Sequence, residues 1–169
     1  MMIESIQSEL LGAIGSRLVG RGWKLATAES CTGGLVAHWI TAQAGCSAWY
    51  QGGVVAYANA TKTALLGVPE ALLEAHGAVS PAVAMAMARG AGRAIPGTDL
   101  ALGITGIAGP DGGTEAKPVG CVYVALAGVG ESCDVVRLDL VGSRAEIQIA
   151  AGKAALQMIY DKVSAVRDA

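Results

Sequence analysis

The sequence predicts an α/β protein: a layered α/β/α sandwich with a mixed sheet, folded as a single domain over residues 1–169. The chain length is that of one ordinary domain. Apolar residues at helical spacing open and close the chain, and short apolar runs of strand length lie between them. Two of these runs are adjacent late in the chain with no helix between them, which indicates an antiparallel portion in the sheet.

Helices and strands alternate in the first half. The spacing of Ile3, Ile6, Leu10, Ile14 and Leu18 predicts an amphipathic first helix. Gly20 and Gly22 are expected to end it. The elements expected next are a strand over 23–28, a helix after Gly33-Gly34, a strand over 54–57 and a short helix stopping at Gly67.

Capping patterns organise the second half. Pro69 suits the start of a short helix that Gly77 ends, and Ser80-Pro81 is a cap followed by proline at the start of a helix through residue 94. Strands are expected over 99–105, 119–126 and 135–140. Ser143 and Glu146 form a capping box for the last helix. Its expected apolar face is Ile149, Leu156, Ile159, Val163 and Val166.

Composition excludes several classes of function. The net charge is −2 and no basic run is present, which argues against nucleic-acid binding. The uncharged stretch 39–61 is broken by glycines and amides, so it is a poor membrane span. The N-terminus lacks an export pattern, so we expect a cytoplasmic protein. Only 15% of the residues are charged. An Ala- and Gly-rich surface then indicates a homo-oligomer, a dimer or a multiple of one, with a tightly packed monomer as an equal alternative.

Metal and disulfide chemistry have little support. The four cysteines form no CxxC pair, and two histidines give no metal-ligand spacing. We expect reduced thiols, no metal and no cofactor. Cys31 follows a predicted strand where a helix N-terminus would lower a thiol pKa, but His38 points away from that end. A cysteine nucleophile is therefore a minor alternative.

Three segments carry residues suited to chemistry. The first runs from Glu29 to Gly34 and includes Ser30, Thr32 and Gly33, where hydroxyls and N–H groups at a helix start can hold an anion. An ordinary helix cap would look the same.

The second segment offers a nucleophile and a base. It contains Ser47, Tyr57, Asn59 and Lys62. A lysine in an apolar neighbourhood can have a lowered pKa and activate a serine, although most lysines are simply solvated.

The third segment is a glycine-rich loop. It begins with Thr105-Gly106 after a buried strand, where open α/β sheets bind ligands. It is neither a P-loop nor a dinucleotide fingerprint, and a long surface turn is the plainer interpretation. Arg144, just after a helix cap, can hold a phosphate or carboxylate, or be a surface residue.

Together these segments resemble the CinA C-terminal domain family, the nicotinamide-nucleotide amidases. The matching stretches are TAESCTGG (27–34), AGCSAW (44–49), YANATK (57–62), HGAVS (76–80) and TGIAGPDGGTEAKPVG (105–120). The resemblance implies an α/β sandwich and hydrolysis of the carboxamide of nicotinamide mononucleotide by serine and lysine without metal. The functional residues implied by position are Ser30, Ser47, Tyr57, Lys62, Thr105 and Arg144. Longer members carry a further N-terminal domain, and this chain resembles the stand-alone form, without pyrophosphatase activity.

The resemblance leaves the roles of the two serines open. A phosphate in the turn after Ser30 would disfavour an alkoxide there, so we expect Ser47 to be the nucleophile, with Ser30 the alternative. A non-catalytic nucleotide-binding module that regulates a partner is the second functional hypothesis. A structural subunit of a DNA-uptake complex is a third, which the lack of a basic patch disfavours.

Overall fold

The computed structural model describes residues 2–128 and 132–165, with side chains from residue 7 onward. Its centre is a five-stranded sheet in the order β2-β1-β3-β4-β5. The first three strands along the chain are parallel, and the last two are antiparallel. This confirms the expected mixed sheet. The strands are β1 (Leu25–Glu29), β2 (Tyr50–Val55), β3 (Leu100–Gly106), β4 (Cys121–Ala127) and β5 (Cys133–Asp139).

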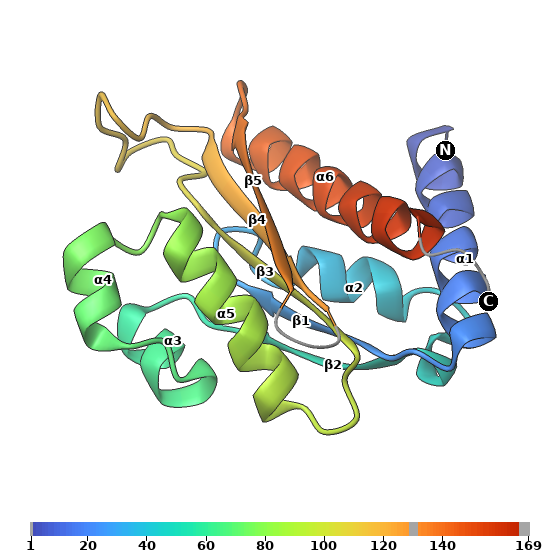
Figure 1. The fold of residues 1–169 in the computed structure, drawn as a ribbon. Helices are drawn as coiled ribbons and strands as arrows, with labels where there is room; N and C mark the ends of the chain where they lie inside the picture. The colour runs from blue at the N-terminus through green and yellow to red at the C-terminus, as the bar shows by residue number, and fades with distance from the viewer. Residues whose placement is uncertain (1, 129–131, 166–169) are drawn as a thin grey trace.

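Helices cover both faces of the sheet, as Figure 1 shows. One layer contains α1 (Met2–Arg21), α2 (Leu35–Thr41) and α6 (Arg144–Ala165), and the other contains α3 (Asn59–Leu66), α4 (Glu70–His76) and α5 (Pro81–Ala94). Aliphatic side chains from the first layer and the sheet form the larger core cluster, and α5 packs on the opposite face. The α/β/α sandwich is therefore confirmed. In the described part of the chain, no helix is long and apolar enough to cross a bilayer.

The predicted caps form as expected. Ser80 Oγ accepts a hydrogen bond from Val83 N at 3.3 Å, with Pro81 opening α5. Ser143 N donates to the Glu146 carboxylate at 2.8 Å, and Glu146 N donates back to Ser143 Oγ at 3.4 Å, which completes the capping box of α6. These local patterns placed the helix starts correctly because each needs only neighbouring residues.

Two local predictions differ from the structure. Strand β2 begins at Tyr50, not at residue 54, because Gly52 and Gly53 hid its start. A Cβ at Gly53 would lie 2.3 Å from Thr27 Oγ1, so β1 approaches this part of β2 closely. On α6, Ile149 is 40% exposed and is not on the buried face.

Small residues form much of that buried face instead: Ala151, Gly152 and Ala155. A Cβ at Gly152 would lie 2.5 Å from the Trp39 ring, so α2 crosses α6 closely. Val166 lies outside the described residues.

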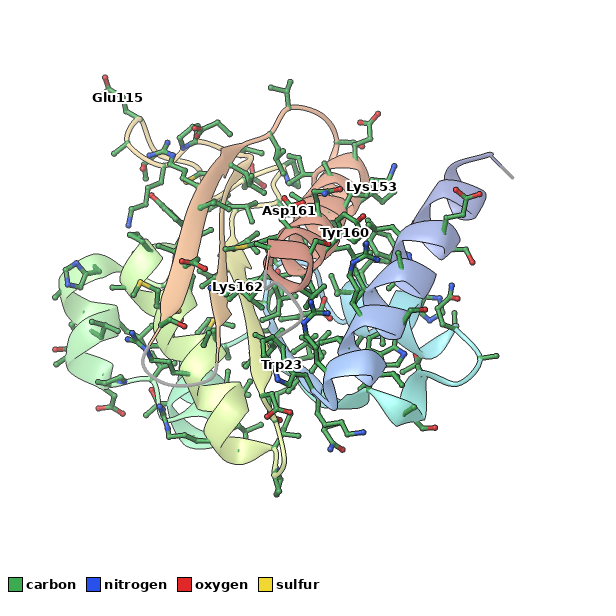
Figure 2. The ribbon with its side chains drawn as sticks, turned by 45° about the vertical axis from the view of Figure 1, so that its right-hand side comes forward. Trp23, Glu115, Lys153, Tyr160, Asp161 and Lys162 are labelled. Carbon is green, nitrogen blue, oxygen red and sulfur yellow. The ribbon has the colours of Figure 1, made fainter. Side chains whose placement is uncertain are left out.

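A long loop joins β3 to β4 and projects beyond the edge of the sheet. Figure 2 shows Glu115 at its tip. Inside the loop, Thr114 N donates to Lys117 O at 2.8 Å, and Lys117 Nζ donates to His76 O at 2.7 Å. The base of this loop lies at the edge where the three parallel strands end.

Candidate functional site

A pocket of about 230 Å³ lies at the carboxyl edge of the parallel strands. Residues that directly follow β1, β2 and β3 line it, together with the start of α3, the link between α4 and α5, and the start of α6. Because parallel strands end at one edge, segments far apart in sequence meet there, as expected for ligand sites in such sheets.

Lys62 and Ser30 meet at the bottom of this pocket. Lys62 Nζ lies 3.1 Å from Ser30 Oγ and 2.8 Å from the carbonyl oxygen of Tyr57. The Lys62 side chain is 1% exposed. Ser30 is fixed from the other side, because its N–H continues the β1–β3 ladder by donating to Ile104 O at 3.0 Å. The two groups therefore lie within hydrogen-bonding distance on rigid elements.

Burial lowers the pKa of Lys62 below its ordinary value, and the Cys31 sulfur opposes this shift. Among the described residues, no ion pair joins Lys62 to a carboxylate. An amine without a counter-ion in a dehydrated position is easier to deprotonate. It can then accept the proton of the Ser30 hydroxyl.

The turn after Ser30 was expected to bind an anion of the substrate, but a carboxylate of the protein itself is bonded there. The buried Glu29 carboxylate accepts from Gly34 N at 3.1 Å, Val36 N at 3.2 Å and Ala37 N at 2.8 Å. It also accepts from the Thr32 hydroxyl at 2.6 Å.

The donors expected to bind a phosphate are thus bonded within the chain. Gly33 N donates to Ser30 O at 3.0 Å, and Thr32, Gly33 and Gly34 do not line the pocket. The Glu29 carboxylate caps the start of α2, so a phosphate there would meet a negative charge and the already bonded N–H groups of Gly34, Val36 and Ala37.

Arg144 and Tyr57 form the mouth of the pocket. The Arg144 guanidinium donates to the Tyr57 hydroxyl at 3.0 Å and to Gly109 O at 2.7 Å. Tyr57 is 61% exposed, and its side chain lies at the rim while its carbonyl faces Lys62. The start of α6 is thereby tied to the β2–α3 link and to the glycine-rich loop.

The remaining expected residues on this edge also line the pocket. Asn59, Thr105 and Gly106 do so, and the Thr105 hydroxyl donates to Ala78 O at 2.8 Å. This hydrogen bond joins β3 to the link between α4 and α5, so the Thr105 hydroxyl proton is already used. The glycine-rich loop continues through a cis peptide bond between Gly109 and Pro110.

Ser47 lies elsewhere. It is exposed in the 3-10 helix Cys46–Ala48, which precedes β2 at the end of the sheet opposite the pocket. The six residues of β2 then separate it from the site by about 20 Å at 3.3 Å per residue. Within this chain, Ser47 is not brought to Lys62.

The Cys31 thiol lines the pocket but is poorly suited to be a nucleophile. Burial raises its pKa to about 12, and the Glu29 charge adds to that shift while its own backbone N–H, Lys62 and Arg144 oppose it. The expected lowering by a helix start does not occur, because Glu29 already occupies that helix end.

Glu29 and Asp111 lie in segments that the sequence singled out, but sequence reasoning gave neither of them a role. Glu29 could have been noticed as the one charged residue of a buried strand, where burial demands a partner. Asp111 lines the pocket from the glycine-rich loop, but a loop aspartate carries no distinguishing pattern. In the described part of the chain, no group of three histidine, cysteine or carboxylate side chains could hold a metal.

The fold and the pocket define a three-layered α/β protein with a buried serine–lysine pair at the carboxyl edge of its sheet. The model of the CinA C-terminal domain matches residues 7–163, and the chain belongs to that family.

Two solved structures are similar over nearly the whole chain. A competence damage-inducible protein A from Klebsiella pneumoniae is 35% identical with a TM-score of 0.90, covering 95% of this chain and 99% of its own. A competence/damage inducible protein from Agrobacterium tumefaciens is 37% identical with a TM-score of 0.89, covering 94% of this chain and 95% of its own.

Curated relatives are longer. A CinA-like protein from Geotalea uraniireducens is 50% identical over 148 residues, which are 88% of this chain and 35% of that protein. One from Anaeromyxobacter is 54% identical over 153 residues, which are 90% of this chain and 37% of that protein. The chain thus spans about a third of the length of these relatives.

Proposed function

We propose that this chain hydrolyses the carboxamide of nicotinamide mononucleotide to nicotinic acid mononucleotide and ammonia, in cytoplasmic recycling of pyridine nucleotides. The buried Lys62 amine, 3.1 Å from the Ser30 hydroxyl, is the observation that carries the proposal. A binding protein has no need for a lysine without a counter-ion beside a serine, whereas an amide hydrolase needs a base and a nucleophile in contact.

The first half of the reaction forms an ester. Ser30 Oγ attacks the carboxamide carbon as its proton passes to neutral Lys62, and the carbonyl electrons move onto oxygen. Collapse of this tetrahedral intermediate breaks the carbon–nitrogen bond. The departing amide nitrogen takes the proton from Lys62 and leaves as ammonia, and the acyl group remains on Ser30.

The second half consumes one water. Lys62 accepts a proton as water oxygen attacks the ester carbon, and the second tetrahedral intermediate expels Ser30, which regains a proton from Lys62. The carboxylic acid product then ionises and its proton is taken up by ammonia. The balance is one carboxamide and one water giving one carboxylate and one ammonium.

Ser30 is preferred to Ser47 as the nucleophile because two observations agree. Lys62 contacts Ser30, and Ser47 lies at the opposite end of the sheet. Ser47 was expected to be the nucleophile because a phosphate was expected in the turn after Ser30, but the Glu29 carboxylate occupies that turn.

The substrate phosphate then requires another cation. Arg144 at the mouth of the pocket supplies it, and Tyr57 orients the guanidinium through its hydroxyl. Asn59, beside them, adds an amide for the ribose or phosphate. We propose that phosphate binds at the mouth and carboxamide at the base, beside Lys62.

Two substitutions test the assignment. Ser30→Ala should abolish ammonia release from nicotinamide mononucleotide while product affinity stays near wild type. Ser47→Ala, the matched control, should retain turnover, because its hydroxyl is exposed outside the pocket. Loss of turnover in Ser47→Ala with full activity in Ser30→Ala would reverse the roles. If the wild-type protein binds the mononucleotide but releases no ammonia, the regulatory binding hypothesis stands instead.

A further inference from the structure

We propose that the backbone N–H groups of Gly106 and Cys31 form the oxyanion-binding site for the tetrahedral intermediates on Ser30. This assignment rests on the proposed hydrolysis of an amide at Ser30. It comes from the hydrogen bonds of the β1–β3 ladder and from the point where that ladder stops.

The ladder determines where the Gly106 N–H points. In a parallel pair, alternate residues of a strand direct both backbone groups to the same neighbour. Ile104 faces β1, since its carbonyl accepts from Ser30 N at 3.0 Å. Ile107 faces β4, since its N–H donates to Cys121 O at 2.9 Å. Gly106, two residues after Ile104, therefore faces the end of β1.

The expected acceptor of that N–H is already used. If the ladder continued, Gly106 N would donate to Ser30 O, but the chain turns away and Ser30 O accepts Gly33 N at 3.0 Å. In the described part of the chain, Gly106 N donates to no residue outside the strands, and Ile107 N rather than Gly106 N faces Cys121 O of β4. Gly106 lines the pocket together with Ser30 and Lys62. A backbone donor left unpaired at a pocket is available to a ligand.

Cys31 supplies the second donor by its position. In serine hydrolases with a strand-to-helix turn at the nucleophile, the N–H of the next residue helps to bind the oxyanion. Here the later donors of the turn, Gly34 N and Ala37 N, are bonded to Glu29. Among the described residues, Cys31 N donates to no residue other than its own thiol, and Cys31 also lines the pocket.

Gly106 N lies at the end of β3, and Cys31 N follows the end of the neighbouring β1. Both lie next to the bond from Ser30 N to Ile104 O that joins these strand ends. This arrangement suits an oxygen attached to the carbon that Ser30 attacks. Donors held by the backbone need no rearrangement as negative charge develops, so they stabilise the intermediate more than the substrate. Their removal should lower kcat and leave product affinity unchanged.

A side-chain substitution cannot test this cleanly. A Cβ at Gly106 would lie 2.6 Å from Val122 Cγ2, so alanine or proline would disturb β4. Replacing the Gly106 amide by an ester, with glycolic acid at residue 106, deletes the N–H and adds no side chain. It also makes the Thr105 carbonyl a weaker acceptor, an effect that the melting temperature reports. The sequence allows total synthesis from three pieces joined at Gly45-Cys46 and Gly120-Cys121, so the ligations leave native residues.

The control is the same ester at Gly97, an exposed turn residue outside the pocket. We expect the ester at 106 to lower kcat by about 100- to 1,000-fold relative to the all-amide protein. The dissociation constant of nicotinic acid mononucleotide and the melting temperature should match those of the Gly97 ester. Turnover above a tenth of wild type, or an equal loss in the Gly97 ester, would overturn the inference.

The outcome separates this inference from the proposed function. An active all-amide protein with an undisturbed 106 ester overturns the oxyanion site alone. If the all-amide protein releases no ammonia from the mononucleotide but cleaves p-nitrophenyl acetate, the substrate proposal fails and the ester comparison is made on that substrate. A protein inactive on both would overturn both proposals.

Discussion

Lys62 combines nearly complete burial with the absence of a carboxylate partner among the described residues. Such an amine is poorly stabilised when charged, and its two contacts, Ser30 Oγ and Tyr57 O, are neutral. Replacing the charged amine by an apolar group should therefore not lower the stability of the fold, whereas the loss of the nitrogen should lower turnover. The two effects are separable by one substitution.

We expect Lys62→Met to lower turnover by about 100- to 10,000-fold, the usual effect of losing a positioned general base. Its melting temperature should equal or exceed that of wild type, because methionine fills similar space without a buried amine. Lys153→Met, on the exposed side of α6, is the matched control and should change neither quantity. A Lys62→Met protein with more than a tenth of wild-type turnover would show that Lys62 is not the base.

The pH profile should report the lowered pKa of Lys62. Only the neutral amine accepts the serine proton, so kcat/KM should rise with pH through that pKa and level off below pH 10.5. The unfolded chain binds this proton more tightly than the folded chain. The stability of wild type relative to Lys62→Met should therefore rise with pH between the two pKa values. A flat kcat/KM profile from pH 5 to 10 would contradict the assignment.

Helix α2 depends on a carboxylate from the preceding strand. Glu29 joins the end of β1 to the start of α2 through one hydroxyl and three backbone N–H groups, and it is 1% exposed. Ser30 is the next residue, so these bonds hold the backbone beside the nucleophile that we propose.

Glu29→Ala should lower the free energy of unfolding by about 1–3 kcal/mol, since buried donors lose a charged acceptor. Urea unfolding measures this. Glu146→Ala, which removes the exposed cap of α6, should shift the midpoint less. Equal shifts in the two variants would mean that burial of the Glu29 carboxylate adds nothing.

At the level of elements, the sequence predicted what depends on near neighbours. The caps at Ser80 and Ser143, and the helix ends at Gly67 and Gly77, were confirmed because each is a pattern of a few residues. The start of β2 was not, since glycines argue against a strand in the sequence and the close approach of β1 that requires Gly53 is visible only in the fold.

The candidate site was predictable only in part. Sequence order indicated that Tyr57 and Lys62 converge, and the structure brings them together through the Tyr57 carbonyl. Which serine meets Lys62 depends on the end of the sheet at which each lies, and that requires the strand bounds. Whether the turn after Ser30 can bind an anion depends on the position of the Glu29 carboxylate, which the sequence does not give.

For the whole molecule, low surface charge leads us to expect a homo-oligomer, a dimer or a multiple of one. Charged residues are only 15% of the chain, and the exposed large apolar side chains include Val19, Val136 and Val141. Sedimentation equilibrium at micromolar concentration should give a multiple of 16.9 kDa. Because such contacts are apolar, moderate salt should not dissociate them. A single 16.9 kDa species would contradict the expectation.

The projecting loop between β3 and β4 should allow a protease to cut the chain into two pieces (Figure 2). Between Arg93 and Lys117 the chain has no basic residue, and Lys117 precedes proline, so trypsin has no site in the loop. A glutamate-specific protease should instead cut first after Glu115, at the exposed tip. Mass spectrometry should find pieces 1–115 and 116–169. First cleavage in α4, at Glu70 or Glu74, would contradict this.

The two pieces should remain associated, because β3 and β4 pair along their whole length and α6 packs on the sheet. Ser30, Lys62 and Gly106 belong to one piece, and Arg144 to the other. Neither half alone would carry a complete site, while the reassembled pair would. The protein could therefore serve as a two-part reporter, in which joining two fused partners restores the release of ammonia.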